Sequence, residues 1–296
     1  MKKMITIAVD AMGGDNAPQK IIDGIELHQK KSKDIFYKIF GDRNLIEPLI
    51  KKKSIDNSFF ELVHTEEKIK SEDSAFTAAK RGKKTSMWLA IESVKNNLSD
   101  IVISAGNTGA LLVIAKLNLK MIENIDKPAL SGLWPSKKGM SVVLDLGANI
   151  ECSDKNLIDF AIMGSSLLKS LFPEEKAKVA LLNIGSEEVK GNEIIKETYQ
   201  KLNQIVNEEF EFKGFIEGSH IMDGNVNVVV ADGFTGNVAL KTAEGTANFI
   251  TSELKEAMKS SILGKIGSLI SINNLKKFKK KLDPRLYNGA ILLGLD

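Results

Sequence analysis

Residues 101–110 read Ile-Val-Ile-Ser-Ala-Gly-Asn-Thr-Gly-Ala, an apolar run that ends in a turn of glycine and asparagine. Apolar side chains on consecutive positions are typical of a strand that is covered on both faces. The turn leads into a stretch with the apolar spacing of a helix, at residues 108–122. A buried strand that passes through a glycine-rich turn into a helix is the unit from which parallel α/β folds are built.

The same alternation continues in both directions along the chain. Further buried strands are predicted at residues 5–9, 35–40, 59–63, 142–146, 179–183 and 226–231, and further helices at 75–96, 156–171 and 188–207. Strands that alternate with helices are joined by right-handed crossovers and form a mostly parallel sheet. Because the sequence has no proline-rich or serine-rich linker and no internal repeat, we expect one Rossmann-like, three-layer α/β catalytic domain over residues 1–296.

The composition is that of an ordinary globular protein, with 43% hydrophobic and 27% charged residues. The formal net charge of +3 is too small to predict nucleic-acid binding. No stretch is long and apolar enough to span a bilayer, and Asp10 interrupts the first apolar run too early for a signal peptide. The single cysteine, Cys152, excludes an internal disulfide. We therefore expect a cytoplasmic protein.

Glycine, asparagine and aspartate gather in five loops that follow predicted strands, at residues 10–18, 104–110, 145–149, 183–192 and 232–237. The carboxyl ends of parallel strands share one edge of the sheet, so we expect these loops to converge on one crevice. Glycine lets the backbone approach a ligand closely, and the N–H groups at helix starts attract anions. Any one loop is more simply explained as a turn that caps the next helix, but the five together indicate an anion site.

Signatures of the common nucleotide and hydrolase sites are missing, because no strand is followed by G-x-G-x-x-G and neither G-x-x-x-x-G-K-[ST] nor G-x-S-x-G occurs. Cys152 is interpreted as an inert loop thiol, and His220, the one histidine expected near the crevice, as a loop residue without a catalytic task. A crevice poor in general bases suits a nucleophile that is already anionic, such as inorganic phosphate. Side chains suited to phosphate are Lys190, Asn107, Asn149, Asn192 and Asn237.

Taken together, the loop motifs resemble the bacterial phosphate acyltransferases of phospholipid synthesis. The motifs are Asp-Ala-Met-Gly-Gly-Asp-Asn-Ala-Pro from Asp10, Ser-Ala-Gly-Asn-Thr-Gly-Ala from Ser104, Leu-Asp-Leu-Gly-Ala-Asn from Leu144, Leu-Leu-Asn-Ile-Gly from Leu181 with Lys-Gly-Asn from Lys190, and Asp-Gly-Phe-Thr-Gly-Asn-Val-Ala-Leu-Lys from Asp232. The resemblance extends to Glu244 with Gly245, Asp-Pro-Arg at 283–285, Gly289 with Ala290, and the Leu-Leu-Gly that ends at Gly294. It therefore covers essentially the whole chain.

The resemblance implies a reaction in which acyl carrier protein, loaded with a fatty acyl thioester, and inorganic phosphate give acyl phosphate and the free carrier. It implies a fold like that of isopropylmalate dehydrogenases and phosphate acetyltransferases, a cytosolic homodimer, and no metal or organic cofactor. A membrane-bound glycerol-3-phosphate acyltransferase would consume the product on the route to phosphatidic acid.

The resemblance also assigns site residues. Lys190 and Asn237 are expected to be catalytic, holding the phosphate or the developing oxyanion, while residues 104–109 donate backbone amides. Phosphate or substrate contacts are expected from Asp10, Gly13, Gly14, Asp15, Ser104, Gly106, Asn107, Thr108, Gly109, Asp145, Asn149, Asn192, Asp232, Gly236 and Lys241. For Lys241, a place on an exposed helix surface is as good an interpretation.

Family members continue past the Leu-Leu-Gly motif through a further strand, a His-Gly-Ser loop and a final helix. This chain ends at Asp296, so we expect that sheet edge and one loop of the crevice to be missing from it.

Residues 255–285 form a lysine-rich amphipathic segment, predicted to be two helices broken at Gly264, Gly267 and the pair Asn273 and Asn274. Three interpretations stay open: a solvated face over an ordinary helix pair, peripheral contact with an anionic membrane, or docking of the acidic carrier protein.

Two other functions are alternatives. One is a phosphate acetyltransferase-like enzyme that uses acyl-CoA, and the other is a non-catalytic, membrane-associated scaffold. The missing dinucleotide fingerprint argues against an NAD-dependent dehydrogenase.

Overall fold

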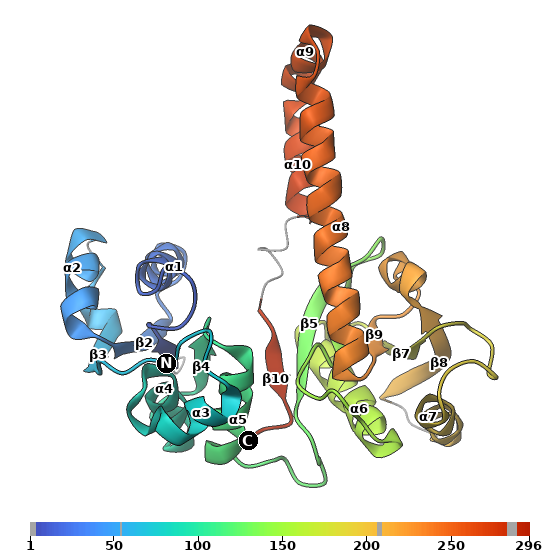
Figure 1. Ribbon diagram of the computed structural model, residues 1–296, viewed down its shortest axis with the longest axis horizontal. Helices are drawn as coiled ribbons and strands as arrows, with labels where there is room; N and C mark the ends of the chain where they lie inside the picture. The colour runs from blue at the N-terminus through green and yellow to red at the C-terminus, as the bar shows by residue number, and fades with distance from the viewer. Residues whose placement is uncertain (1–3, 54, 206–208, 283–288) are drawn as a thin grey trace. The chain divides into compact units, whose positions relative to one another are not determined.

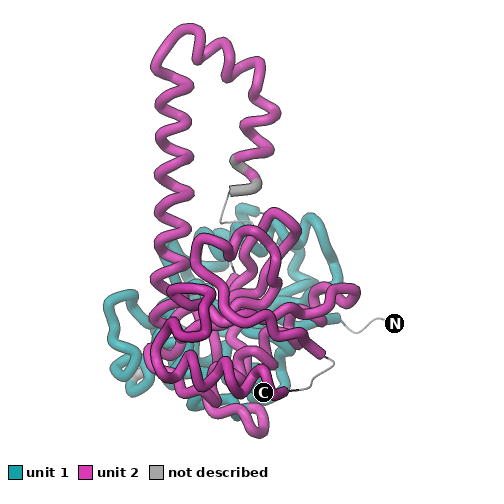
Figure 2. Tube along the Cα trace, turned by 90° about the vertical axis from the view of Figure 1, so that its right-hand side faces the viewer, with its two compact units in different colours: residues 1–121, 295–296 teal, residues 122–294 magenta. Residues whose placement is uncertain are grey.

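The computed structural model describes residues 4–53, 55–205, 209–282 and 289–296. The chain divides into two compact units, which Figure 2 colours separately: a first unit of residues 1–121 with 295–296, and a second unit of residues 122–294. Each unit is an α/β structure and is described by itself. The prediction of one catalytic domain stays a prediction, and the motif at 283–285 lies outside the described residues.

The first unit is built on a parallel four-stranded sheet with the order β3-β2-β1-β4. Its elements are β1 (Ile5–Asp10), α1 (Gln19–Gln29), β2 (Ile35–Gly41), α2 (Arg43–Lys53), η1 (Asn57–Phe59), β3 (Phe60–His64), α3 (Ala75–Arg81), η2 (Gly82–Lys84), α4 (Ser86–Lys95), β4 (Ile101–Ser104) and α5 (Thr108–Asn118). Ile22, Ile39 and Ile46 are fully buried where α1 and α2 pack on the sheet. In the parallel register Asp10 lies opposite Ser104, which brings the ends of β1 and β4 together.

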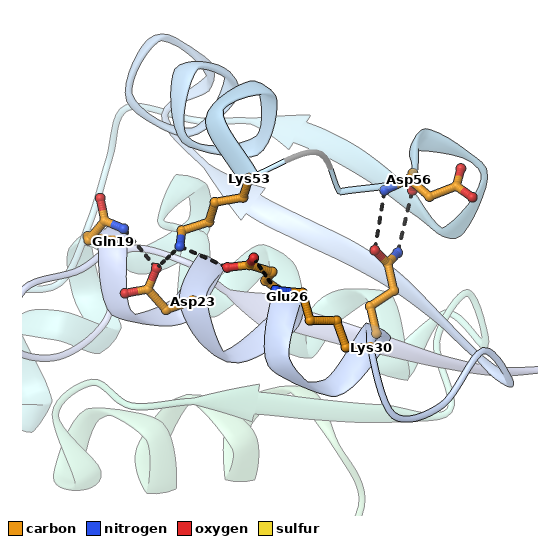
Figure 3. Close-up of polar contacts among 7 residues, drawn as sticks. Gln19, Asp23, Glu26, Lys30, Lys53 and Asp56 are labelled. Atoms are coloured by element: carbon orange, nitrogen blue, oxygen red, sulfur yellow. Dashed lines mark hydrogen bonds and ion pairs between the residues drawn. The ribbon is translucent and has the colours of Figure 1, made fainter.

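An ion-pair cluster joins α1 to α2 (Figure 3). Lys53 Nζ lies 2.6 Å from Asp23 Oδ1 and 2.9 Å from Glu26 Oε2. Hydrogen bonds to these carboxylates raise the pKa of Lys53, and those of Asp23 and Glu26 are lowered. Beside them the backbone N–H of Asp56 donates to Gln29. The cluster fixes the outer helices of the first unit and contains none of the predicted site residues.

The second unit is built on a mixed six-stranded sheet with the order β10-β5-β6-β9-β7-β8. Its elements are β5 (Ala129–Pro135), β6 (Met140–Leu144), α6 (Asp154–Leu171), β7 (Ala177–Asn183), α7 (Glu193–Gln204), β8 (Phe210–Glu217), η3 (Gly218–Asp223), β9 (Val228–Val230), α8 (Gly233–Lys259), α9 (Ile262–Ile270), α10 (Ile272–Leu282) and β10 (Ile291–Leu293). Strands β6, β9, β7 and β8 are parallel, whereas β5 and β10 are antiparallel additions at one edge. Phe160, Leu144 and Leu181 are fully buried in its core.

The predicted mostly parallel α/β fold is confirmed, and its strands are divided between two sheets instead of lying in one. The helix predicted at 75–96 is interrupted by η2, because the Thr85 hydroxyl donates to Gly82 O at 2.7 Å and accepts from Trp88 N to begin α4. The helix predicted at 188–207 begins only at Glu193, after Gly191 with φ +94°. Strands β5, β8 and β10 were not predicted.

Helix α8 extends away from the rest of the second unit, α9 forms the tip, and α10 runs back (Figures 1 and 2). The predicted break points are wrong, since Gly264 and Gly267 lie inside α9 and the two asparagines inside α10. The breaks fall at serines, where the Ser261 side chain accepts from Gly264 N at 2.9 Å and begins α9. Within the described part of the chain, no helix has the length and apolar character needed to cross a membrane.

Candidate functional site

In the first unit, the end of β1 is held by the carboxylate of Asp10, which is buried. Asp10 accepts hydrogen bonds from the hydroxyls of Ser86 and Ser104, each at 2.6 Å, and from the N–H of Met12 at 3.2 Å. Ser104 in turn accepts from Gly106 N at 3.1 Å. The carboxylate therefore joins the loops after β1 and β4 to the start of α4, and it positions these loops. Ser86 gave no signal in the sequence, because it lies 76 residues from its partner.

The two glycines after β1 allow the neighbouring loop to approach. A Cβ atom on Gly13 would lie 2.5 Å from Asp10 Oδ2 and 2.8 Å from Gly106 N. Gly14 has φ +89°, and a Cβ there would lie 2.5 Å from Ala105 O. Both positions therefore require glycine. The next residue, Asp15, is exposed, and within the described residues its side chain makes no hydrogen bond.

The loop after β4 ends at Asn107, which caps helix α5. Its side-chain oxygen accepts from Ala110 N at 3.0 Å, and its amide donates to Ser71 O and Asp73 O at 3.1 and 3.0 Å. The Asn107 side chain is therefore fully used in holding the loop. Thr108 and Gly109 are exposed, and helix geometry leaves their N–H groups without an intrahelical acceptor. The first unit thus offers backbone donors to an anion at this helix start.

In the second unit, the buried carboxylate of Asp145 organises the loop after β6. At 2.8–3.1 Å it accepts from the N–H groups of Leu130, Gly147, Ala148 and Asn149 and from the side-chain amide of Asn149. The same amide also donates to Pro128 O at 2.7 Å. Asp145 and the Asn149 amide are therefore engaged in holding the loop in shape, as Asp10 is in the first unit.

The start of α8 is packed tightly against this loop. A Cβ atom on Gly236 would lie 1.9 Å from Asp145 O, so only glycine fits. Asp232 caps the helix, accepting from Thr235 N at 2.8 Å and from its hydroxyl at 2.7 Å. A Cβ on Gly147 would lie 3.2 Å from Asn237 Nδ2, which places the Asn237 amide beside Gly147. Asn237 is exposed, and its amide has no hydrogen-bond partner among the described residues, so it can bind a ligand.

Lys190 lies in the loop after β7. Its backbone oxygen accepts from Asn183 Nδ2 at 3.2 Å, and a Cβ on Gly185 would lie 3.0 Å from Lys190 Cγ, so the loop folds closely around this residue. The Lys190 side chain is exposed and forms no ion pair within the described ranges. Asn192 caps α7 by accepting from Ile195 N at 2.9 Å. The loop therefore presents a free ammonium group on a fixed backbone.

Lys241 differs from Lys190 in its surroundings. Its ammonium lies 2.9 Å from Glu244 Oε2, one helical turn further along the exposed surface of α8. The charge of Lys241 is already paired, whereas Lys190 has no ion-pair partner among the residues that the structure describes. The geometry therefore favours Lys190 as the lysine that binds an anion.

The five predicted loops fall into two groups. Residues 10–18 and 104–110 lie in the first unit, on the adjacent strands β1 and β4. Residues 145–149, 232–237 and 183–192 lie in the second unit and follow β6, β9 and β7, which are neighbours and parallel. Each group therefore shares one sheet edge, and convergence of all five on one crevice stays a prediction.

Two further side chains of the second unit, Cys152 and His220, could carry chemistry. Burial, followed by the charge of Asp145, raises the pKa of Cys152 to about 11, so its thiol stays protonated at neutral pH. His220 lies on η3, where its Nδ1 is 2.8 Å from Asp223 Oδ2. A hydrogen bond from Lys137, with a second from His220, lowers the pKa of Asp223 to about 2. In the described residues no group of three His, Cys, Asp or Glu side chains is placed to hold a metal ion.

Comparison with known proteins gives a consistent picture. Residues 5–296 match the family described as fatty acid synthesis protein. The chain is 72% identical over its whole length to a phosphate acyltransferase of Pelagibacter ubique, of which it covers 88%. It is 42% identical to a phosphate acyltransferase of Paramagnetospirillum magneticum, of which it covers 84%.

Solved structures share the fold at low sequence identity. A phosphotransacetylase from Streptococcus pyogenes superposes with a TM-score of 0.60 at 16% identity, over 83% of each chain. One from Staphylococcus aureus gives a TM-score of 0.58 at 16% identity, also over 83% of each chain.

Proposed function

This chain belongs to the fatty acid synthesis protein family and is an acyltransferase, and from that premise we propose that it transfers a fatty acyl group from acyl carrier protein to inorganic phosphate. A phosphate oxygen attacks the thioester carbonyl carbon. A C–O bond forms, the C–S bond breaks, and the carrier leaves as its thiolate. The products are acyl phosphate and the free carrier. The name shared by the relatives, phosphate acyltransferase, supports the acyl transfer to phosphate.

The observation that carries the proposal is the contrast between engaged and free side chains at the strand ends. The side chains of Asp145, Asn149 and Asp232 form hydrogen bonds within the protein. Those of Lys190 and Asn237, which follow the neighbouring strands β7 and β9, have no partner among the described residues. An ammonium and an amide can neutralise and orient phosphate and the oxyanion that develops during attack. No strong base is needed, because the nucleophile is already an anion. In the first unit, the free N–H groups of Thr108 and Gly109 are proposed as a further anion contact.

We place the enzyme in the cytoplasm as a homodimer that works without metal or organic cofactor. Its product would pass to a membrane-bound glycerol-3-phosphate acyltransferase and so to phosphatidic acid. The α9 tip, residues 262–270, supports peripheral contact with an anionic membrane, because Leu263 and Ile270 are exposed on the same short helix as Lys265.

The test is acyl-phosphate release from phosphate, with palmitoyl acyl carrier protein and acetyl-CoA as competing donors. We expect turnover with the carrier and little with acetyl-CoA. Turnover with acetyl-CoA alone would instead indicate an acetyltransferase. Carrier binding without acyl phosphate from either donor would indicate a scaffold.

A further inference from the structure

Five exposed apolar side chains, which we call the apolar rim, lie in the loops after β6 and β7 and in the first turns of α8, where the candidate site of the second unit lies. Their exposed fractions are 74% for Ile150, 81% for Ile184, 78% for Val189, 63% for Phe234 and 52% for Val238. Isolated exposed apolar residues need no explanation, but a group of them beside a candidate site indicates a binding surface.

The apolar rim follows three neighbouring strands of the second sheet. Ile150 comes after β6, Phe234 and Val238 after β9, and Ile184 and Val189 after β7, and the sheet order is β6-β9-β7. These strands are parallel, so their carboxyl ends lie at one edge. The apolar rim is therefore a row along the edge where the free polar groups lie.

Each part of the apolar rim adjoins a residue of the candidate site. Val189 precedes Lys190 in the same loop. Asn237 and Val238 lie three and four residues after Phe234 on α8, so the three share one helix face. The N–H of Gly233 donates to Asn149 O at 2.8 Å, which holds the turn before Ile150 against the start of α8.

We infer that the apolar rim binds the hydrocarbon chain of the acyl group while Lys190 and Asn237 hold its phosphate end. This inference rests on the proposed function. An acyl phosphate is an anion at one end and a hydrocarbon at the other, and the loops of the second unit present free polar groups and apolar side chains in that adjacent arrangement. The apolar rim would thus select for chain length, because an acetyl group is too short to reach from the phosphate to several of its side chains.

The test measures binding of n-alkyl phosphates, which are stable analogues of acyl phosphates and need no turnover. Butyl, octyl and dodecyl phosphate are titrated calorimetrically below their micelle concentrations. Each methylene that enters an apolar surface is worth up to about fourfold in Kd, so affinity should rise with chain length. In Phe234→Ser, dodecyl phosphate should bind about tenfold more weakly, while butyl phosphate is unchanged. Phe76→Ser is the control, since Phe76 is 68% exposed and lies in the first unit.

Two outcomes overturn the inference. One is a Kd that does not depend on chain length in the wild type, and the other is a chain-length dependence in Phe234→Ser that equals that of the wild type, whether or not all three ligands bind more weakly. The turnover assay separates this inference from the proposed function. Chain-length-dependent binding without acyl-phosphate formation would support the apolar rim and contradict the proposed reaction. Acyl-phosphate formation with a Kd independent of chain length would support the proposed reaction and contradict the role of the apolar rim.

Discussion

Asn149 donates both its backbone N–H and its side-chain amide to Asp145 Oδ2, each at 2.8 Å. The other oxygen of Asp145 accepts three further backbone N–H groups, and the carboxylate has no exposed surface. A carboxylate surrounded by donors in this way shapes the loop and has no remaining position for a substrate. The motif of residues 145–149 therefore acts by positioning its neighbours.

Replacement of Asp145 should destabilise the second unit. In Asp145→Asn, an amide NH2 replaces one oxygen and faces donors, which leaves buried N–H groups without an acceptor. We expect a loss of about 3 kcal/mol in the free energy of unfolding, measured from urea denaturation. Asp15→Asn, at an exposed carboxylate, should change it by less than about 0.5 kcal/mol. Equal stabilities of the two variants would contradict the structural role.

Two glycines of α8 make a matched pair. A Cβ on Gly236 would collide with Asp145 O, whereas a Cβ on Gly245 meets nothing within 4 Å. Gly236→Ala should therefore destabilise the protein by about 3 kcal/mol. Gly245→Ala should stabilise it by about 0.5–1 kcal/mol through helix propensity. Thermal and urea unfolding measure both, and a tolerated Gly236→Ala would show that α8 does not pack this closely on the loop.

Lys190→Ala should lower kcat/KM for acyl-phosphate formation by about 10²-fold or more, because it removes a donor to the anion. Lys176→Ala is the matched control, since Lys176 is also exposed but precedes the amino end of β7, whereas Lys190 follows its carboxyl end. Both variants should keep the wild-type Tm. Unchanged activity in Lys190→Ala would remove this lysine from the site.

Cys152 should react slowly with iodoacetamide in the folded protein. Only the thiolate reacts, and a pKa raised to about 11 by burial and by Asp145 lowers the thiolate fraction at pH 8 about 100-fold relative to the unfolded chain. The rate should rise about tenfold per pH unit and level off near pH 11, whereas in urea it should level off near pH 9. The pH at which the rate levels off reports the pKa of the thiol, independently of how easily iodoacetamide reaches it. A plateau near pH 9 in the folded protein would contradict the prediction.

Sequence patterns predicted the elements whose signal is local. Residues 142–144 are apolar on consecutive positions and lie in β6, although the strand predicted at 142–146 in fact spans Met140–Leu144, and the Gly-Asn turn after β4 begins α5 as expected. The interruption between α3 and α4 depends on the Thr85 hydroxyl bonding Gly82 O, and the edge strand β10 depends on pairing with β5, far away in the chain. Contacts of this kind have no local periodicity, so the sequence did not predict them.

The candidate site shows the same contrast between local sequence signals and contacts that only the fold creates. The motifs identified the loops, but residue type did not reveal which polar groups are already bonded. Asn107 and Asn237 look alike in the sequence, yet Asn107 is fully bonded and Asn237 is free within the described residues. The buried carboxylate of Asp10 accepts one of its hydrogen bonds from Ser86, which lies on a different element. Only the fold separates the positioning residues from those available to a ligand.

The α9 tip should bind anionic membranes, because its exposed apolar residues lie on the same helix as the exposed Lys265. Wild-type protein should sediment with phosphatidylglycerol vesicles at 50 mM salt and much less at 500 mM, since salt screens the attraction of lysine to lipid phosphates. The double variant Leu263→Asp with Ile270→Asp should lose this binding, because it removes the inserting side chains and adds repulsive charge. The control Phe76→Asp with Leu117→Asp alters two apolar residues of the first unit that are also well exposed, at 68% and 61%, and should sediment like the wild type. Undiminished sedimentation of the tip variant, or equal sedimentation with neutral phosphatidylcholine vesicles, would contradict membrane contact through α9.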